Sequence, residues 1–129
     1  MYKVTSILLA VLIAMVMTIV TGCSSNGGVE NEVHVSIDQA LKMWKNEEAI
    51  IIDVRTPQEY KAGHIPGVTN IQLSELESRS SEVPKDKKVL LICRSGNRSS
   101  QGTSLLRSKG FGNVYNITEG MSSWRGPVK

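Results

Sequence analysis

Apolar and polar positions form runs along the chain that predict strands and helices in turn. Two continuous apolar runs, residues 49–54 and 89–92, have the length of short strands that are buried on both faces of a sheet. Shorter apolar stretches at residues 33–35, 68–73 and 114–117 predict three further strands, the first of them at a sheet edge. The pattern therefore predicts five short strands.

The segments between these runs carry the signals of helix starts. Ser36 with Gln39, and Thr56 with Glu59, are spaced as capping boxes, in which two side chains satisfy backbone N–H groups at a helix start. After the first box, apolar residues recur at the spacing of one helical face until about Asn46, where we expect the helix to end.

The second half of the chain predicts three more helical segments. Residues 74–77 open a short helix, and residues 99–109 form a longer one that ends at Gly110, a residue type suited to the position after a helix. Residues 121–124 predict a final helical turn.

Because strands alternate with helices, we expect an α/β fold in which a small parallel β-sheet is flanked by helices on both faces. Functional groups in such sheets gather at the carboxyl ends of the strands. Asp53 lies near the end of the first buried run, and Cys93 directly follows the second. We therefore expect these two residues at the same edge of the sheet.

The N-terminal segment has the pattern of a secretory signal. Lys3 precedes an almost wholly apolar stretch, residues 4–20, and small residues follow. The segment Val20-Thr21-Gly22-Cys23 resembles the bacterial lipobox, a resemblance that implies acylation of Cys23 and removal of residues 1–22. An uncleaved membrane anchor is the alternative, although 17 residues are at the short limit for a bilayer span.

Either interpretation places the protein outside the cytoplasm and attached to a bacterial membrane, on the periplasmic side or at the cell surface. Residues 23–32 are rich in Ser, Gly and Asn, and we expect a flexible tether there. The remaining residues, 33–129, are enough for one domain. Acylation of Cys23 would leave Cys93 as the only free thiol.

Composition excludes several classes of protein. The net charge of +3 is too small to indicate nucleic-acid binding, and the chain has only six aromatic residues, Trp 2, Tyr 3 and Phe 1. Two cysteines cannot form a disulfide framework. Two histidines far apart and no paired cysteines give no pattern of a metal site, and we expect neither a metal nor an organic cofactor.

The turn after the second buried strand has features that activate a thiol. Arg94 and Arg98 bring positive charge near Cys93, and Gly96 allows the backbone N–H groups to turn inward as an anion-binding nest. The helix beginning near Ser99 adds the partial positive charge of its first turn. We interpret Cys93 as a nucleophile, whereas the alternative is a buried structural cysteine.

The segment Cys93-Arg94-Ser95-Gly96-Asn97-Arg98 resembles the active loop of the rhodaneses, the thiosulfate sulfurtransferases. Three further stretches resemble signatures of that family, and they are residues 53–67, 110–115 and 119–124. The resemblance implies a rhodanese-like fold in which Cys93 takes sulfur from a donor such as thiosulfate and becomes a persulfide.

The same resemblance implies roles for the neighbours of Cys93. The backbone from Arg94 to Ser99 would cradle the bound sulfur, and Arg94 and Arg98 would attract an anionic donor. Cyanide, a thiol or another protein would then accept the sulfur, and no metal or cofactor would take part. Nucleic acid is not an expected partner.

Two other polar residues invite a catalytic interpretation. Asp53 could be taken for a general base, but we favour a structural role in which it holds loop N–H groups and the Arg55 side chain. For His64, in the turn Gly-His-Ile-Pro-Gly, we favour a hydrogen bond to the backbone over a partnership with the thiol.

The chain departs from the family's usual pattern at three positions. Glu119 stands where a glycine is common, Val68 where an alanine is usual, and Gly102 where small alanines are usual. We expect local packing to differ from that of the family at the latter two positions. Glu119 is expected to place an acid near the pocket mouth, where it would disfavour anionic substrates.

Two rival functions stay open. A phosphatase of the same fold would use the cysteine and arginine for phosphate, but its loop is one residue longer than the Cys-x4-Arg spacing of Cys93 and Arg98. A sulfur carrier or binding module, loaded by a partner and catalysing little alone, is the second alternative.

Overall fold

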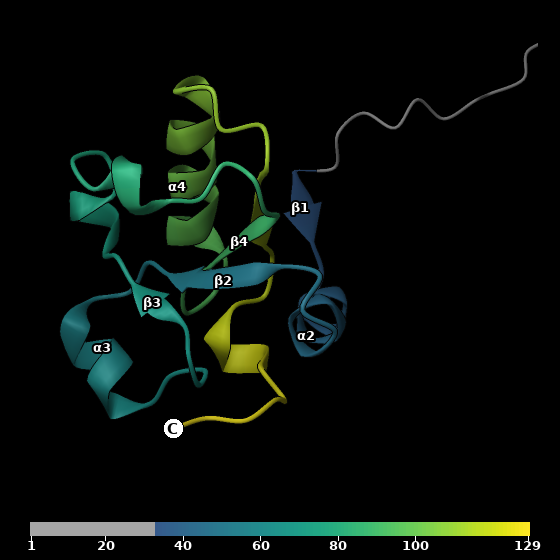
Figure 1. Ribbon diagram of the computed structural model, residues 1–129. Coiled ribbons are helices and arrows are strands. Elements are labelled where there is room, and N and C mark those ends of the chain that lie inside the picture. The colour runs from purple at the N-terminus through teal and green to yellow at the C-terminus, as the bar shows by residue number, and fades with distance from the viewer. Residues whose placement is uncertain (1–32) are drawn as a thin grey trace, which may run out of the picture. The chain divides into compact units, whose positions relative to one another are not determined.

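The computed structural model describes residues 33–129, in which five strands form one parallel sheet of order β1-β5-β4-β2-β3 (Figure 1). The strands are β1 (His34–Val35), β2 (Ile50–Asp53), β3 (Thr69–Asn70), β4 (Val89–Ile92) and β5 (Val114–Ile117). The predicted parallel α/β fold is confirmed. Strand β4 lies at the centre of the sheet, and its four side chains are completely buried.

Within residues 33–129, three helices and two single turns of 3-10 helix connect the strands, and a third such turn follows β5. The helices are α2 (Ile37–Lys45), α3 (Pro57–Ala62) and α4 (Asn97–Ser108), and the turns are η1 (Leu73–Glu75), η2 (Ser80–Glu82) and η3 (Met121–Ser123). Both predicted capping boxes are present, at the starts of α2 and α3. The final turn, η3, also forms where the sequence predicts it.

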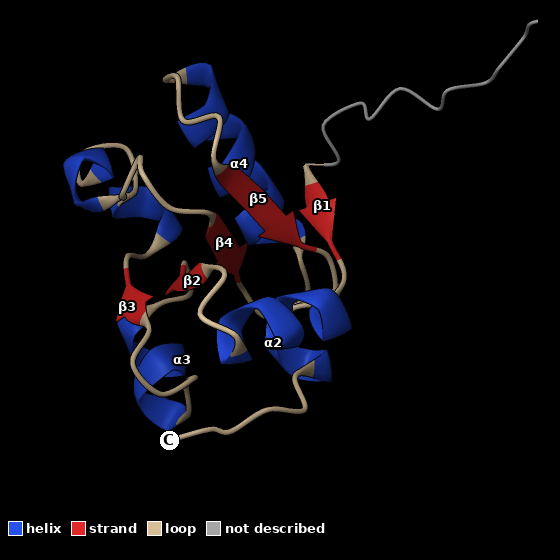
Figure 2. Cartoon of the chain, turned by 45° about the vertical axis from the view of Figure 1, so that its right-hand side comes forward, coloured by secondary structure: helices blue, strands red, loops and turns tan. Residues whose placement is uncertain are grey.

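The helices cover both faces of the sheet, as predicted, with α2 and α4 on opposite sides (Figure 2). Side chains alternate along β4 because successive residues of a strand point to opposite faces. Leu91 packs in the core beneath α4 with Leu106, whereas Leu90 packs in the core beneath α2 with Ile37. The central strand is therefore fixed from both sides.

The register of β2 against β4 decides where the polar ends of the strands lie. Asp53 pairs with Ile92, so the next residue along β4, Cys93, leaves the sheet beside the end of β2. The N–H group of Val54 donates to the carbonyl of Ile92 and continues this alignment by one residue. The prediction that Asp53 and Cys93 share one edge is confirmed.

Some element boundaries differ from the predictions. Helix α4 begins at Asn97, because Gly96 in a left-handed conformation (φ 93°) precedes it, rather than at the predicted residue 99. Only Thr69–Asn70 of the predicted strand 68–73 is regular, although Ile71 and Leu73 still donate backbone hydrogen bonds to β2 and its following residue. The predicted helix at 74–77 is replaced by the short turn η1 and further turns.

The predicted signal peptide, residues 1–22, and the predicted tether, residues 23–32 with the acylated Cys23, lie outside the described residues. Within residues 33–129, none of the helices has the length and apolar character needed to cross a membrane.

Candidate active site

Cys93 occupies the first position after β4, and only 1% of its surface is exposed to solvent. The backbone N–H group of Gly96 donates to the Cys93 sulfur at 3.1 Å, and the hydroxyl of Ser99 lies 3.3 Å from the same sulfur. Gly96 precedes α4 and Ser99 lies in its first turn, so the sulfur sits against the start of that helix. The predicted cradle around the thiol is thus present in the geometry.

Two opposing effects set the acidity of this thiol. Burial, the largest single influence, raises the pKa of Cys93. Hydrogen bonds from the hydroxyl and N–H group of Ser99, and from the N–H groups of Ser95 and Gly96, outweigh burial and bring the pKa below its ordinary value. These contacts therefore favour the thiolate, the nucleophilic form of cysteine, more than the surroundings of an ordinary cysteine would.

Gly96 is required at its position for two reasons. Its φ of 93° lies in the left-handed region, which side chains with a Cβ rarely adopt. A Cβ on Gly96 would also collide with the backbone carbonyl of Thr118. The close approach allows the loop to turn its N–H group inward to the sulfur.

The two loop arginines occupy different environments. Arg98 donates two hydrogen bonds, at 2.7 and 2.8 Å, to the carboxylate of Glu59 in α3. Arg94 is exposed, and within residues 33–129 its side chain makes no ion pair or hydrogen bond. Ser95 and Asn97 are also exposed at this edge of the sheet.

The sequence marks Glu59 as part of a capping box and of a stretch that resembles a family signature, but not as a site residue. It does form that box, since its carboxylate also accepts from the N–H group of Thr56 at 3.0 Å. No local signal links it to Arg98, because the two residues are 39 positions apart. Only the packing of α3 beside the loop brings them together.

Asp53 is completely buried and makes the contacts expected of a structural residue. Its carboxylate accepts from the backbone N–H group of Arg55 at 3.0 Å and from the Arg55 guanidinium at 2.7 Å. The guanidinium continues to the carbonyl of Gly63, also at 2.7 Å. Asp53 and Arg55 therefore join β2 to the turn after α3 and form no hydrogen bond with Cys93.

His64 makes the backbone contact that the sequence suggested. Its Nδ1 lies 2.8 Å from the carbonyl oxygen of Tyr60, and its ring stacks on the Tyr60 ring with centroids 3.7 Å apart. The backbone of His64 also exchanges two hydrogen bonds with Lys129. The His64 ring thus contacts Tyr60, and it forms no hydrogen bond with Cys93.

A second segment, Thr118–Ser122, which we name the strap, lies against the cysteine loop. The N–H group of Met121 donates to the carbonyl of Cys93 at 2.8 Å, and that of Ser122 to the carbonyl of Arg94 at 3.0 Å. Gly120 (φ 70°) lies so close that a Cβ there would be 2.6 Å from the carbonyl oxygen of Cys93. The strap therefore fixes the carbonyl side of the loop.

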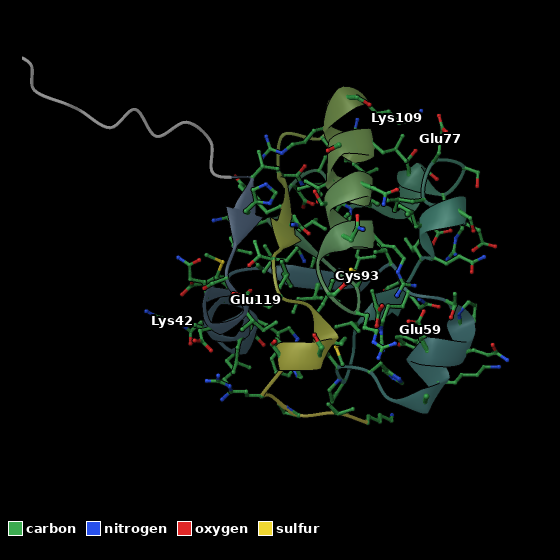
Figure 3. The ribbon with its side chains drawn as sticks, turned by 180° about the vertical axis from the view of Figure 1, so that it is seen from behind. Lys42, Glu59, Glu77, Cys93, Lys109 and Glu119 are labelled. Carbon is green, nitrogen blue, oxygen red and sulfur yellow. The ribbon has the colours of Figure 1, made fainter. Side chains whose placement is uncertain are left out.

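Glu119 belongs to this strap, but its carboxylate is turned toward the start of α2. It accepts a hydrogen bond from the N–H group of Ile37 at 2.8 Å. Figure 3 shows Glu119 on the α2 side of Cys93, whereas Glu59 lies on the opposite side. The carboxylate expected at the pocket mouth is hydrogen-bonded at the start of α2, where helix N–H groups without an intrahelical partner attract negative charge.

Gly102, another departure from the family pattern, has a packing explanation. A Cβ at this position would be 2.9 Å from a methyl group of Leu76 and 3.1 Å from one of Leu91. Helix α4 therefore packs closely on β4 and on the residue after η1, and an alanine here would require these leucine side chains to shift.

Comparisons with known proteins find relatives of similar sequence. One relative is the "Putative sulfur carrier protein YrkF" of Bacillus subtilis. It is 39% identical over 88 residues, which are 68% of this chain and 48% of YrkF. A protein of Allochromatium vinosum named sulfurtransferase is 38% identical over 83 residues, or 64% of this chain and 78% of that protein. The chain therefore spans about half the length of YrkF.

Solved structures show the same fold. The crystal structure of a rhodanese-related protein from Thermoplasma volcanium has a TM-score of 0.69 and 30% sequence identity, and the match covers 74% of this chain and 96% of that one. The rhodanese-like domain family matches residues 36–127. A match that runs from the cap of α2 almost to the last residue shows that this protein belongs to the rhodanese-like domain family.

Proposed function

We propose that this protein is a sulfurtransferase that moves sulfane sulfur from thiosulfate or a similar donor, through a persulfide on Cys93, to a thiol or cyanide. The observation that carries the proposal is the hydrogen bonding of the Cys93 sulfur by Gly96 and Ser99, which lowers the pKa of the thiol. The names of the relatives, a sulfurtransferase and a sulfur carrier, support sulfur transfer in general.

The reaction begins with attack of the Cys93 thiolate on the outer sulfur of thiosulfate. A new S–S bond forms, the bond between the two donor sulfurs breaks, and sulfite leaves with the electron pair. The acceptor, as a thiolate or cyanide, then attacks the outer sulfur of the persulfide, and Cys93 leaves as a thiolate. Neither step requires an external oxidant or reductant.

The residues of the loop supply positioning and electrostatic stabilisation for both steps. Inward N–H groups and the Ser99 hydroxyl stabilise negative charge on the thiolate and on the persulfide that replaces it. Arg94, exposed beside the loop, attracts the anionic donor. Arg98 holds the loop to α3 through Glu59.

The arginine pairing disfavours the phosphatase alternative. A phosphatase needs an arginine that closes on the phosphate, and here Glu59 accepts hydrogen bonds from both terminal nitrogens of Arg98. A partner-loaded sulfur carrier remains the second candidate, favoured by the similarity to YrkF. It differs from the main proposal only in how Cys93 gains its sulfur.

The location of this chemistry is a separate proposal. The sequence at Cys23 favours a lipid-anchored protein on the outer side of a bacterial membrane, either periplasmic or at the cell surface. Mass spectrometry of the protein purified from membranes tests it. An acylated N-terminal Cys23 is expected, and an intact Met1 would contradict the lipoprotein proposal.

Intact-mass analysis of the detergent-solubilised full chain tests the chemistry. Incubation with thiosulfate is expected to add the mass of one sulfur atom, which cyanide then removes as thiocyanate. Cys93→Ser should gain no sulfur, whereas Cys23→Ser should load normally. A wild-type chain that never gains sulfur from thiosulfate but accepts it from a persulfide donor protein would favour the carrier, and hydrolysis of a phosphotyrosine analogue without sulfur loading would favour the phosphatase.

A further inference from the structure

The strap contacts the cysteine loop at several backbone points. The carbonyls of Cys93 and Arg94 accept hydrogen bonds from it, and Gly96 packs against the carbonyl of Thr118. The hydroxyl of Ser99, which also lies 3.3 Å from the Cys93 sulfur, is 3.5 Å from the carbonyl of Ile117, the residue before the strap. The strap therefore contacts both halves of the loop around the thiol.

The position of the strap depends on its own attachment to β1 and α2. The N–H group of Thr118 donates to the carbonyl of Val35 at 3.0 Å. The next residue, Glu119, accepts from the N–H group of Ile37 at 2.8 Å and also from the hydroxyl of Thr118. These bonds join the strap to a part of the chain that lies about 80 positions earlier.

The Glu119 bond is additional to the ordinary cap of α2. The capping box already satisfies the N–H groups of Ser36 and Gln39 through the side chains of those same two residues. Glu119 instead binds the N–H group at the first helical position, Ile37, from a distant segment. Its hydrogen bonds with Thr118 and Ile37 hold the pKa of this exposed carboxyl below its ordinary value, so the group is anionic at neutral pH.

We propose that Glu119 is a positioning residue for Cys93. It anchors the strap to the start of α2, and so fixes the loop carbonyls and the groups that donate hydrogen bonds to the Cys93 sulfur. The inference rests on the proposed function in one respect: the geometry of the Cys93 thiol matters for sulfur transfer only if the protein is a sulfurtransferase. Glu119 touches no reacting atom itself.

The physical consequence of losing the anchor follows from the contacts. Without Glu119, the strap keeps the Thr118–Val35 bond but loses its side-chain attachment to α2. A small outward shift of the strap lengthens the bond from Met121 to the Cys93 carbonyl and relaxes the packing around Gly96. The Gly96 N–H group then donates less well to the sulfur, and the pKa of the thiol rises.

The test compares Glu119→Ala with Gln39→Ala in the full-length protein. Both variants remove one side-chain acceptor at the start of α2, but only Glu119 connects to the strap. The rate of alkylation of Cys93 by iodoacetamide, followed on the peptide that contains it, gives the pH profile of the thiol. Urea unfolding measures how much stability each variant loses.

For Glu119→Ala we expect the alkylation midpoint to move to higher pH and sulfur loading from thiosulfate to slow about fivefold, a modest loss for a displaced catalytic group. Gln39→Ala should lose similar stability but keep the wild-type midpoint. Glu119→Gln, which retains an oxygen acceptor for Ile37, should restore most of the loading rate.

An unchanged midpoint in Glu119→Ala, or an equal shift in Gln39→Ala, would overturn the positioning role. Failure of the proposed function is distinguishable from this outcome. If the wild-type protein never gains sulfur, sulfur transfer is wrong, whereas the alkylation profiles still decide whether Glu119 positions the thiol.

Discussion

Arg98 at the start of α4 and Glu59 in the first turn of α3 form an ion pair through two hydrogen bonds of 2.7 and 2.8 Å. The pair connects the end of the cysteine loop to the helix beside it. Hydrogen bonding from Arg98 is the main reason why the pKa of Glu59 is lowered to about 2. The ion pair is therefore complete at all pH values at which the protein would normally act.

Replacing Glu59 should make the free energy of unfolding depend less on pH in the acid range. A carboxyl whose pKa is lower in the folded state contributes stability above its unfolded pKa and loses it as the pH falls through the folded value. Both side chains are about one third exposed, so we expect Glu59→Gln to lose about 1 kcal/mol at pH 7. Urea unfolding should show this difference shrinking between about pH 4.5 and about pH 2.

Asp86→Asn supplies a control for the loss of one negative charge, because Asp86 is exposed in a turn. A constant difference between wild type and Glu59→Gln down to pH 2 would contradict the assignment of the pair.

Ser99→Ala should weaken the thiolate of Cys93. The Ser99 hydroxyl and N–H group are among the contacts that lower the thiol pKa, and the hydroxyl lies 3.3 Å from the sulfur. Loss of the hydroxyl should therefore raise the pKa and slow alkylation at pH 7 by on the order of fivefold. The pH profile should move upward without a change in the maximal rate at high pH, whereas Ser104→Ala, exposed on the same helix, should leave it unchanged.

Arg94→Ala should affect binding of the donor more than the chemical step. Its side chain is exposed and forms no ion pair among the described residues, so its charge is available to an anion. We expect KM for thiosulfate to rise about threefold to tenfold and kcat to change little, with the effect fading at high salt because exposed charges are screened. A kcat that falls while KM stays constant would assign Arg94 to the reaction itself.

Asp53→Asn should destabilise the fold without changing the chemistry of the folded fraction. The substitution leaves the Arg55 guanidinium buried beside a neutral partner, and breaking a buried pair in this way costs about 3–5 kcal/mol. Urea unfolding gives the loss of stability, and sulfur loading per folded molecule at low temperature gives the chemistry. Folded protein that no longer loads sulfur would support Asp53 as a general base.

Gly120→Ala should distort the cysteine loop. The new Cβ would lie 2.6 Å from the carbonyl oxygens of Cys93 and Arg94, at a backbone φ of 70°. We expect a loss of about 1–3 kcal/mol in stability and slower alkylation of Cys93. Gly112→Ala is the matched control, since a Cβ at Gly112 meets no atom within 4 Å. Normal alkylation in Gly120→Ala would show that the strap tolerates displacement.

The features that the sequence predicted well are local. Continuous apolar runs identified β2 and β4, and the capping boxes identified the starts of α2 and α3. The shared edge of Asp53 and Cys93 followed from the alternation of strands and helices, because parallel strands end at the same side of a sheet. The strand and helix predictions use neighbouring residues only, and the shared edge needs in addition only the assumption that both strands lie in one parallel sheet.

The features that the sequence did not predict depend on long-range contacts. Glu59 meets Arg98 across 39 positions, and Glu119 meets Ile37 across 82. Each acid stands out locally for a different reason. Glu59 belongs to a capping box, and Glu119 stands where the family pattern has a glycine. Neither local feature specifies the distant partner. The early start of α4 has a similar cause, because Gly96 takes its left-handed conformation under the carbonyl of Thr118.

The central position of β4 has a consequence for hydrogen exchange. Its backbone is hydrogen-bonded between β2 and β5, and its four side chains are completely buried. The amide protons of such a strand exchange with solvent only when the whole domain opens, so they report global unfolding. Within residues 33–129 we therefore expect the β4 amides to be among the slowest to exchange, and Cys93 directly follows them in the chain.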